Sequence, residues 1–124
     1  MSLILIVEDN DKNMKLVRDI LQAGGHATIE AVTGEDGVAL AQQRKPDLIL
    51  MDIQLPGING IEALQILRAD PATASIPIIA VTASVMQQDR AMITEAGFDA
   101  YVGKPLILKE FREAVRVALE GPAK

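Results

Sequence analysis

Acidic, hydroxyl and amino side chains follow the short apolar runs of this sequence, each close to the point where a run ends. Glu8 and Asp9 follow the first run, Asp52 a later one, Thr82 the next, and Lys104 comes shortly after the last. At an effective dielectric constant of about 20, two like charges about 4 Å apart repel by roughly 4 kcal/mol. If these run ends converge in the fold, the three carboxylates therefore need a cation.

The sequence offers oxygen ligands for such a cation and little else. It contains no cysteine, and its single histidine, His26, precedes a run that ends without a polar group. Oxygen ligands favour Mg²⁺ over zinc. Mg²⁺ keeps several waters and can bind phosphoryl oxygens, while the ammonium of Lys104 and the hydroxyl of Thr82 are suited to hold the others. The set predicts phosphoryl transfer to a carboxylate, with Asp52 as the nucleophile.

The runs that position these residues are aliphatic or β-branched, and they predict five strands. The strands are expected at Leu3–Val7, Ala27–Ala31, Leu48–Met51, Ile78–Val81 and Ala100–Val102. Three of the runs are apolar almost throughout, as is typical of strands buried on both faces of a parallel sheet.

Stretches of helical periodicity separate the runs. Three helices are expected after N-cap candidates at Asp9 or Asn10, Thr33 and Asn59, the last with Glu62 in capping-box spacing. A fourth, more polar helix is expected from about Met86 to Ala96. The fifth is expected along an apolar stripe of Leu108, Phe111, Val115, Ala118 and Leu119.

This alternation predicts an α/β fold, a three-layer α/β/α sandwich with a five-stranded parallel sheet. The second strand ends in Ala31-Val32 and contributes no polar group. The strand order 2-1-3-4-5 puts that strand at an edge and brings the other four ends together, where ligands bind in such sheets. We expect residues 1–124 to form a single domain.

Composition narrows the classes of partner. The 17 acidic and 12 basic residues give a net charge of -5, the wrong sign for attraction to nucleic-acid phosphates or anionic membranes. No apolar run approaches the roughly 18 residues of a membrane span. We therefore expect a soluble, cytoplasmic protein that neither binds DNA directly nor inserts into a membrane.

The sequence closely resembles the receiver domain of bacterial two-component response regulators over essentially its whole length. Four segments carry the resemblance: Ile4–Asn10, Asp47–Gly57, Pro77–Ala83 and Gly103–Pro105. Within the family, single-domain regulators of bacterial cell-cycle control are the most similar, through Asn13–Leu16 and Met51–Pro56. The resemblance implies a flavodoxin-like fold.

The resemblance also implies roles for single residues. Asp52 would be the phosphoacceptor, and Mg²⁺ would be held by Glu8, Asp9, Asp52 and the backbone carbonyl of Gln54. Lys104 would contact the phosphoryl group, and its bond to the following proline would be cis. Glu8 departs from the commonest pattern, which has Asp there, so the resemblance leaves direct and water-mediated contact with the metal open.

Signalling follows from the same resemblance. Thr82 and Tyr101 would form the switch pair, and a histidine kinase or a phosphotransfer protein would supply the phosphoryl group. A downstream protein target would read the face made by the fourth helix, the fifth strand and the fifth helix, and the chain would be a monomer or a weak homodimer. Its catalysis would be confined to its own phosphorylation and dephosphorylation, so we expect no enzyme in the usual sense.

Three alternatives remain. The first is a receiver domain cut from a hybrid histidine kinase or another multidomain protein. The second, an aspartyl-phosphate phosphatase, is disfavoured because such enzymes need an acid two residues after the nucleophile, where this chain has Gln54. The third, a flavodoxin-like electron carrier, is disfavoured because Glu8–Asp11 stands where a hydroxyl-rich phosphate loop is needed.

Overall fold

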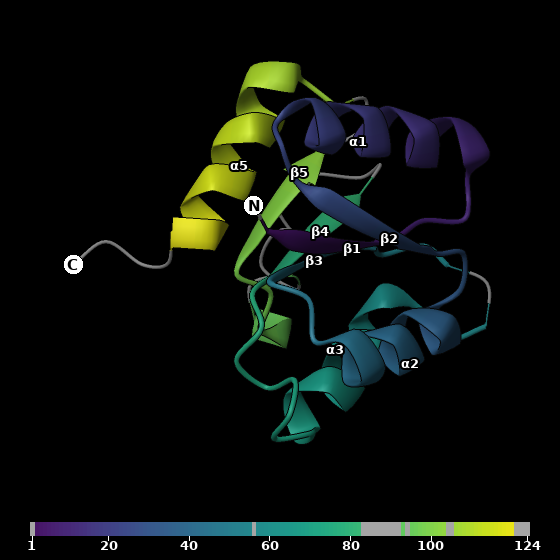
Figure 1. Ribbon diagram of the computed structural model, residues 1–124. Helices are drawn as coiled ribbons and strands as arrows, with labels where there is room; N and C mark the ends of the chain where they lie inside the picture. Colours follow the sequence, from purple (N-terminus) through teal and green to yellow (C-terminus); the bar gives the residue numbers. More distant parts are fainter. Residues whose placement is uncertain (1, 56, 83–92, 94, 104–105, 121–124) are drawn as a thin grey trace.

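The computed structural model describes residues 2–55, 57–82, 93, 95–103 and 106–120, and within them strands and helices alternate (Figure 1). The strands are β1 (Leu3–Val7), β2 (Ala27–Ala31), β3 (Leu48–Asp52), β4 (Ile78–Thr82) and β5 (Ala100–Gly103). The helices with described bounds are α1 (Asp11–Ala23), α2 (Gly34–Arg44), α3 (Gly60–Ala69) and α5 (Leu108–Glu120).

The strands form one parallel sheet in the order β2-β1-β3-β4-β5, which confirms the predicted topology. β1 lies between β2 and β3, so Ile6 is paired with Glu30 on one side and with Leu50 on the other. Because all strands run the same way, their carboxyl ends meet at one edge of the sheet, and β2 stands apart from β3 and β4.

N-cap side chains that accept backbone hydrogen bonds determine where three of the helices begin. Asn10 caps α1, Thr33 caps α2 and Asn59 caps α3, each accepting a hydrogen bond from the backbone N–H three residues later. At α3 the capping box is complete, because the Glu62 carboxylate accepts the Asn59 N–H at 3.0 Å. These caps satisfy backbone donors that have no partner inside the helix, and they fix the residue at which each helix begins.

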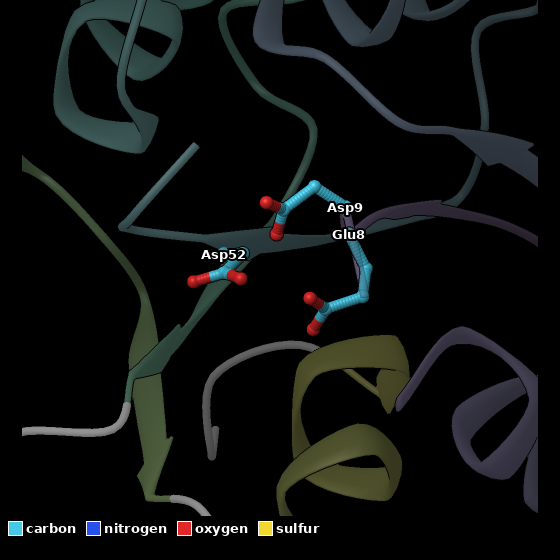
Figure 2. Close-up of side chains that lie close together, drawn as sticks. All are labelled: Glu8, Asp9 and Asp52. Carbon is cyan, nitrogen blue, oxygen red and sulfur yellow. The ribbon is translucent and has the colours of Figure 1, made fainter. Parts of the chain in front are cut away.

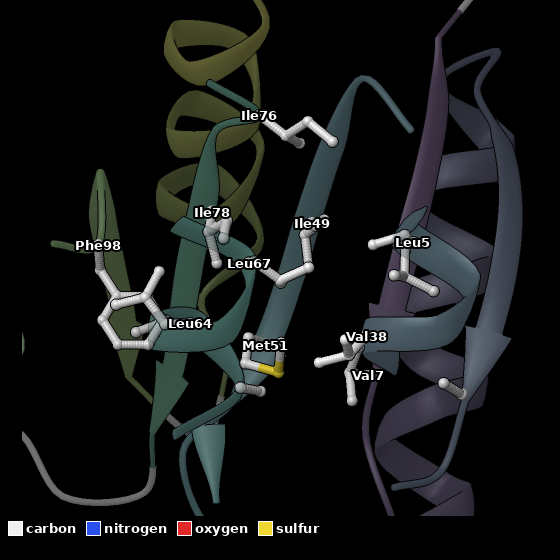
Figure 3. Packing of buried hydrophobic residues seen from close by; sticks show 14 of the residues in the cluster. Leu5, Val7, Val38, Ile49, Met51, Leu64, Leu67, Ile76, Ile78 and Phe98 are labelled. Carbon is white, nitrogen blue, oxygen red and sulfur yellow. The ribbon is translucent and has the colours of Figure 1, made fainter. Parts of the chain in front are cut away.

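The two faces of the sheet are buried by different helices (Figure 1). Leu5, Ile49 and Ile78 face α2 and α3, where they pack in one cluster with Leu64 and Leu67 (Figure 3). Their alternation with residues of the opposite face follows from the two-residue period of a strand.

The opposite face packs on α1 and α5. Ile4, Leu50 and Ile79 lie in a second cluster with Val17 of α1 and Phe111 of α5. Burying one such side chain stabilises the fold by about 1.5–3 kcal/mol. The middle of the sheet is therefore rigid, and side chains at its carboxyl end are held on a fixed frame.

Two expectations, for the helix before β5 and for the start of α5, differ in outcome from the rest of the fold. Of the helix expected from about Met86 to Ala96, only residues 93, 95 and 96 lie in the described part, where they are helical. Leu108 was expected on the buried stripe of the last helix but is 44% exposed. Side chains of a helix lean toward its N-terminus, and Leu108, at the first position of α5, has no preceding helical turn to lie over. Among the described residues, no helix is long and apolar enough to cross a membrane.

Candidate functional site

The end of β1 places two acids side by side in sequence but in different surroundings. The backbone N–H of Glu8 donates to the Ala31 carbonyl at 3.0 Å, which extends the ladder between β1 and β2 by one residue. The Glu8 side chain is buried, and its Oε2 accepts the Asn10 N–H at 3.1 Å. Asp9 is exposed. One carboxylate is thus fixed by the sheet, and the next one reaches the solvent.

Asp52 is the last residue of β3 and is 4% exposed. Its Oδ1 accepts the backbone N–H of Gln54 at 3.0 Å, a short turn that orients the carboxylate. The N–H of Ile53 donates to the Val81 carbonyl at 3.1 Å, so pairing with β4 continues past the end of the strand. The chain is therefore held on both sides of Asp52.

The carboxylates of Glu8, Asp9 and Asp52 come together as the sequence predicts. One oxygen of each lies within 4.8 Å of the others. Figure 2 shows all three facing a common space, two from the end of β1 and one from the end of β3. Like charges at this spacing repel, and a set made of carboxylate oxygens is the donor set that Mg²⁺ prefers. The described residues fit a magnesium site.

Gly60, at the start of α3, lies directly against the backbone of Asp52. Its N–H donates to the Ile53 carbonyl at 3.0 Å, and a Cβ built on it would lie 2.4 Å from the Asp52 carbonyl oxygen. No side chain fits there without moving the strand end. Sequence reasoning missed this residue, although a glycine in the first turn after the Asn59 cap, where it weakens a helix, was a signal that could have identified it.

The first turn of α2 supports the loop between β3 and α3 from the other side. A Cβ on Gly34 would lie 2.7 Å from the Ile58 side chain, and Gly57 has a φ of +74°, which favours glycine. A Cβ on Gly57 would meet the Glu35 carboxylate at 2.6 Å. The loop that contains Gln54 is therefore packed between two helix N-termini, a contact that sequence reasoning also missed.

Thr82 and Tyr101 lie on neighbouring strands. Thr82 ends β4 and is 3% exposed, while Tyr101 in β5 is half-buried and packs against the cluster that faces α2 and α3. In the register of the two strands, Tyr101 pairs with Ala80, two residues before Thr82. Lys104, and the Pro105 to which it is bonded, lie outside the described residues.

Comparison with known proteins identifies the family to which this site belongs. Residues 4–116 match the family described as the response regulator receiver domain. The chain belongs to this family. It is a receiver domain of the response regulators of two-component signalling, as the residues at the strand ends indicated.

Curated relatives of this receiver domain include the polar-differentiation response regulators DivK of Brucella anthropi and Brucella ovis. Each is 44% identical over 113 residues, which are 91% of this chain and 92% of the relative. These matches confirm the expected similarity to single-domain regulators.

Solved receiver domains share the fold and, in one case, hold the expected metal. A receiver domain of a sensor histidine kinase from Pseudomonas aeruginosa PAO1 has a TM-score of 0.90 and 32% identity, with 97% of this chain and 98% of that chain covered. It is described with a magnesium ion coordinated in its active-site cleft. A putative response regulator from Chloroflexus aurantiacus has a TM-score of 0.93 and 28% identity, with the same coverage.

Proposed function

We propose that Asp52 is the phosphoacceptor of this receiver domain, and that Mg²⁺ is held by Glu8, Asp9 and Asp52 together with the backbone carbonyl of Gln54. The observation that supports this most strongly is the meeting of three carboxylates within 4.8 Å at the carboxyl end of the sheet. Glu8 and Asp52 are both buried and each is oriented by a backbone N–H, but only Asp52 stands at the end of β3, the middle strand of the sheet. It therefore combines a fixed direction with access to the common space.

The phosphoryl donor we propose is a phosphohistidine of a histidine kinase or of a phosphotransfer protein. A carboxylate oxygen of Asp52 forms a bond to phosphorus while the phosphorus–nitrogen bond breaks, and the electron pair stays on the imidazole nitrogen. Bound Mg²⁺ would supply positive charge that offsets the charge on the phosphoryl oxygens. Lys104, after β5, would offset the remainder.

The backbone around Asp52 supports this role. The Gln54 N–H donates to Oδ1 of Asp52 and so fixes the direction of the carboxylate. Gly60 and the first turn of α2 pack against the loop after Asp52, the loop that contains Gln54, and hold it in place. Little reorganisation is needed when the donor arrives, which is how a preorganised site lowers a barrier.

The output we propose is a change of binding surface. Thr82 would turn toward a phosphoryl oxygen on Asp52, and Tyr101 would turn inward from its half-buried position. The surface altered would be that of β5, α5 and the helix expected around residues 86–96, and a downstream protein would bind it. Amide chemical shifts with and without beryllofluoride test this, since changes confined to the acidic cluster would contradict it.

Intact-mass measurement after incubation with acetyl phosphate and Mg²⁺ tests the proposed phosphorylation. We expect wild type to gain one phosphoryl group, and Asp52→Asn and wild type in excess EDTA to gain none. Asp99→Asn is the matched control, because Asp99 is an aspartate that lies before β5, away from the cluster. It should be labelled like wild type. Equal labelling of Asp52→Asn would contradict the proposal.

A further inference from the structure

A pocket lies between α1 and α5, with a volume of about 370 Å³. Its walls are apolar and come from Ile20 and Leu21 of α1 and from Phe111, Val115 and Leu119 of α5. The volume is within the range of small-molecule sites, which combine apolar walls with a few polar groups.

The pocket is separate from the acidic cluster. Its lining includes Ser2, just before β1, and His26, just before β2. These residues stand at the amino ends of their strands, whereas Glu8, Asp9 and Asp52 stand at carboxyl ends. A parallel sheet places these ends on opposite sides of the domain, so a ligand here would not contact the phosphoacceptor.

His26 presents a polar atom that lacks a partner. Its Nδ1 is buried and makes no hydrogen bond. An unsatisfied buried nitrogen loses its hydration without compensation, so such an atom in a native fold calls for an explanation. Because the atom is enclosed, a ligand oxygen can accept a hydrogen bond from Nδ1–H only after the imidazole ring turns toward the pocket, and binding with that turn would supply one.

The charged side chains at the rim of the pocket favour a ligand of negative charge. Arg116 lines it but is engaged by Glu113 and by both carboxylate oxygens of Glu120, each at 3.0 Å. Arg112 also lines it and, within the described part of the chain, makes no ion pair or hydrogen bond. One guanidinium is therefore available, while the nearby carboxylate of Glu120 is already neutralised.

We propose that this pocket binds a small carboxylate with an aliphatic chain of medium length. The chain lies against Ile20, Phe111 and Leu119, and the carboxylate accepts hydrogen bonds from the Arg112 guanidinium and, once the imidazole ring has turned, from Nδ1–H of His26. Neither the pocket nor this ligand class depends on the proposed phosphorylation of Asp52.

Titration of the isotopically labelled full chain in Mg²⁺-free buffer, followed by NMR, tests the inference. The probes are octanoate, octan-1-ol and octylamine, which share one chain and differ in charge. We expect octanoate to give saturable shifts at the amides of Leu21 and Val115 and at the His26 ring. Octanol should bind roughly tenfold more weakly, because it lacks a charged acceptor, and octylamine should bind no better than octanol.

Three variants sharpen this test. Arg112→Gln and His26→Phe should each weaken octanoate binding by roughly tenfold. Lys109→Gln is the matched control, an exposed cation on α5 that does not line the pocket, and it should bind as wild type does. Because Arg112 is exposed, its variant keeps the test valid even if His26→Phe fails to fold. Absence of saturable shifts at on the order of 10 mM octanoate, equal binding of octylamine, or unchanged binding by Arg112→Gln would overturn the proposal.

Discussion

Carboxylates stand at both ends of the sheet, and the two ends treat them differently. Before the strands, Asp47 accepts the Leu3 N–H at 2.8 Å, and Asp99 accepts the Ile78 N–H at 2.8 Å. Asp99 also pairs with Arg68 at 2.8 Å. After the strands, three carboxylates face one another within 4.8 Å. The acids before the strands are each paired with hydrogen-bond donors. The acids after the strands also face one another, although Glu8 and Asp52 each accept a backbone N–H.

Arg68 shows what matched charges do at the amino end. Besides Asp99, its guanidinium donates to the carbonyls of Ala74, Ile76 and Gly97, at 3.0, 2.6 and 3.2 Å. One side chain thus ties the last turn of α3 to the segments that lead into β4 and β5. At the amino end of the sheet, ion pairs and hydrogen bonds stabilise the fold. At the carboxyl end, the three carboxylates repel one another, and a bound cation would offset that repulsion.

The largest difference in stability between the two ends should come from adding one methyl group, by a glycine-to-alanine substitution at each end. We expect Gly60→Ala to lower the free energy of unfolding by about 3 kcal/mol, because its Cβ would lie 2.4 Å from the Asp52 carbonyl oxygen. At Gly24, before β2, the nearest atom to a new Cβ is 3.4 Å away, so Gly24→Ala should change stability by less than about 0.5 kcal/mol. Urea unfolding measures both, and similar losses would contradict the packing described.

Mg²⁺ should stabilise one end only. At about 100 times its dissociation constant, the ion should raise the free energy of unfolding of wild type by about 2.7 kcal/mol. Asp9→Asn should lose most of this gain, and Asp99→Asn should keep it. Thermal unfolding with and without MgCl₂ provides the measurement. An equal response of both variants would place the bound ion elsewhere.

In Mg²⁺-free buffer, removing one negative charge should change the free energy of unfolding in opposite directions at the two ends of the sheet. Asp99→Asn should lower the free energy of unfolding by about 1.5 kcal/mol, because charge-assisted hydrogen bonds to Arg68 are lost. Asp52→Asn should raise it by about 1 kcal/mol, because repulsion within the cluster falls while the amide oxygen still accepts the Gln54 N–H. Destabilisation by Asp52→Asn would show that the cluster is a structural element instead.

The smallest effect is expected on the surface of α5. Hydrogen bonding from Arg116 lowers the pKa of the exposed Glu113 below its ordinary value of 4.5. A lowered pKa contributes stability above the ordinary value, and that contribution is lost as the pH falls through the lowered one. Glu113→Gln should therefore leave the thermal midpoint at pH 7 almost unchanged, since exposed pairs contribute little. A large drop at pH 7 would contradict this.

The sheet order and the acidic cluster were predictable because they depend on local signals. Runs of apolar residues mark the strands, caps such as Thr33 and Asn59 mark the helix starts, and the polar residues at four strand ends are consistent with one order. Glu8 also joins the cluster despite its longer side chain, with one oxygen within 4.8 Å of Asp9 and Asp52.

Contacts between distant segments were not predictable in this way. His26 is half-buried with its Nδ1 enclosed, because it lines the pocket that the distant helix α5 completes. Gly60 matters through its approach to Asp52, which only the packed fold shows. Such features depend on packing between elements, and a single sequence does not display that packing.

Locating the phosphoryl group tests the central claim most directly. After incubation with acetyl phosphate and Mg²⁺, borohydride reduction converts a phosphorylated aspartate to homoserine and leaves ordinary carboxylates unchanged, so peptide mass mapping identifies the residue. We predict homoserine at Asp52 alone, and none when EDTA replaces Mg²⁺. Homoserine at Asp9 or at another acid, or an equal yield at Asp52 in EDTA, would contradict the account.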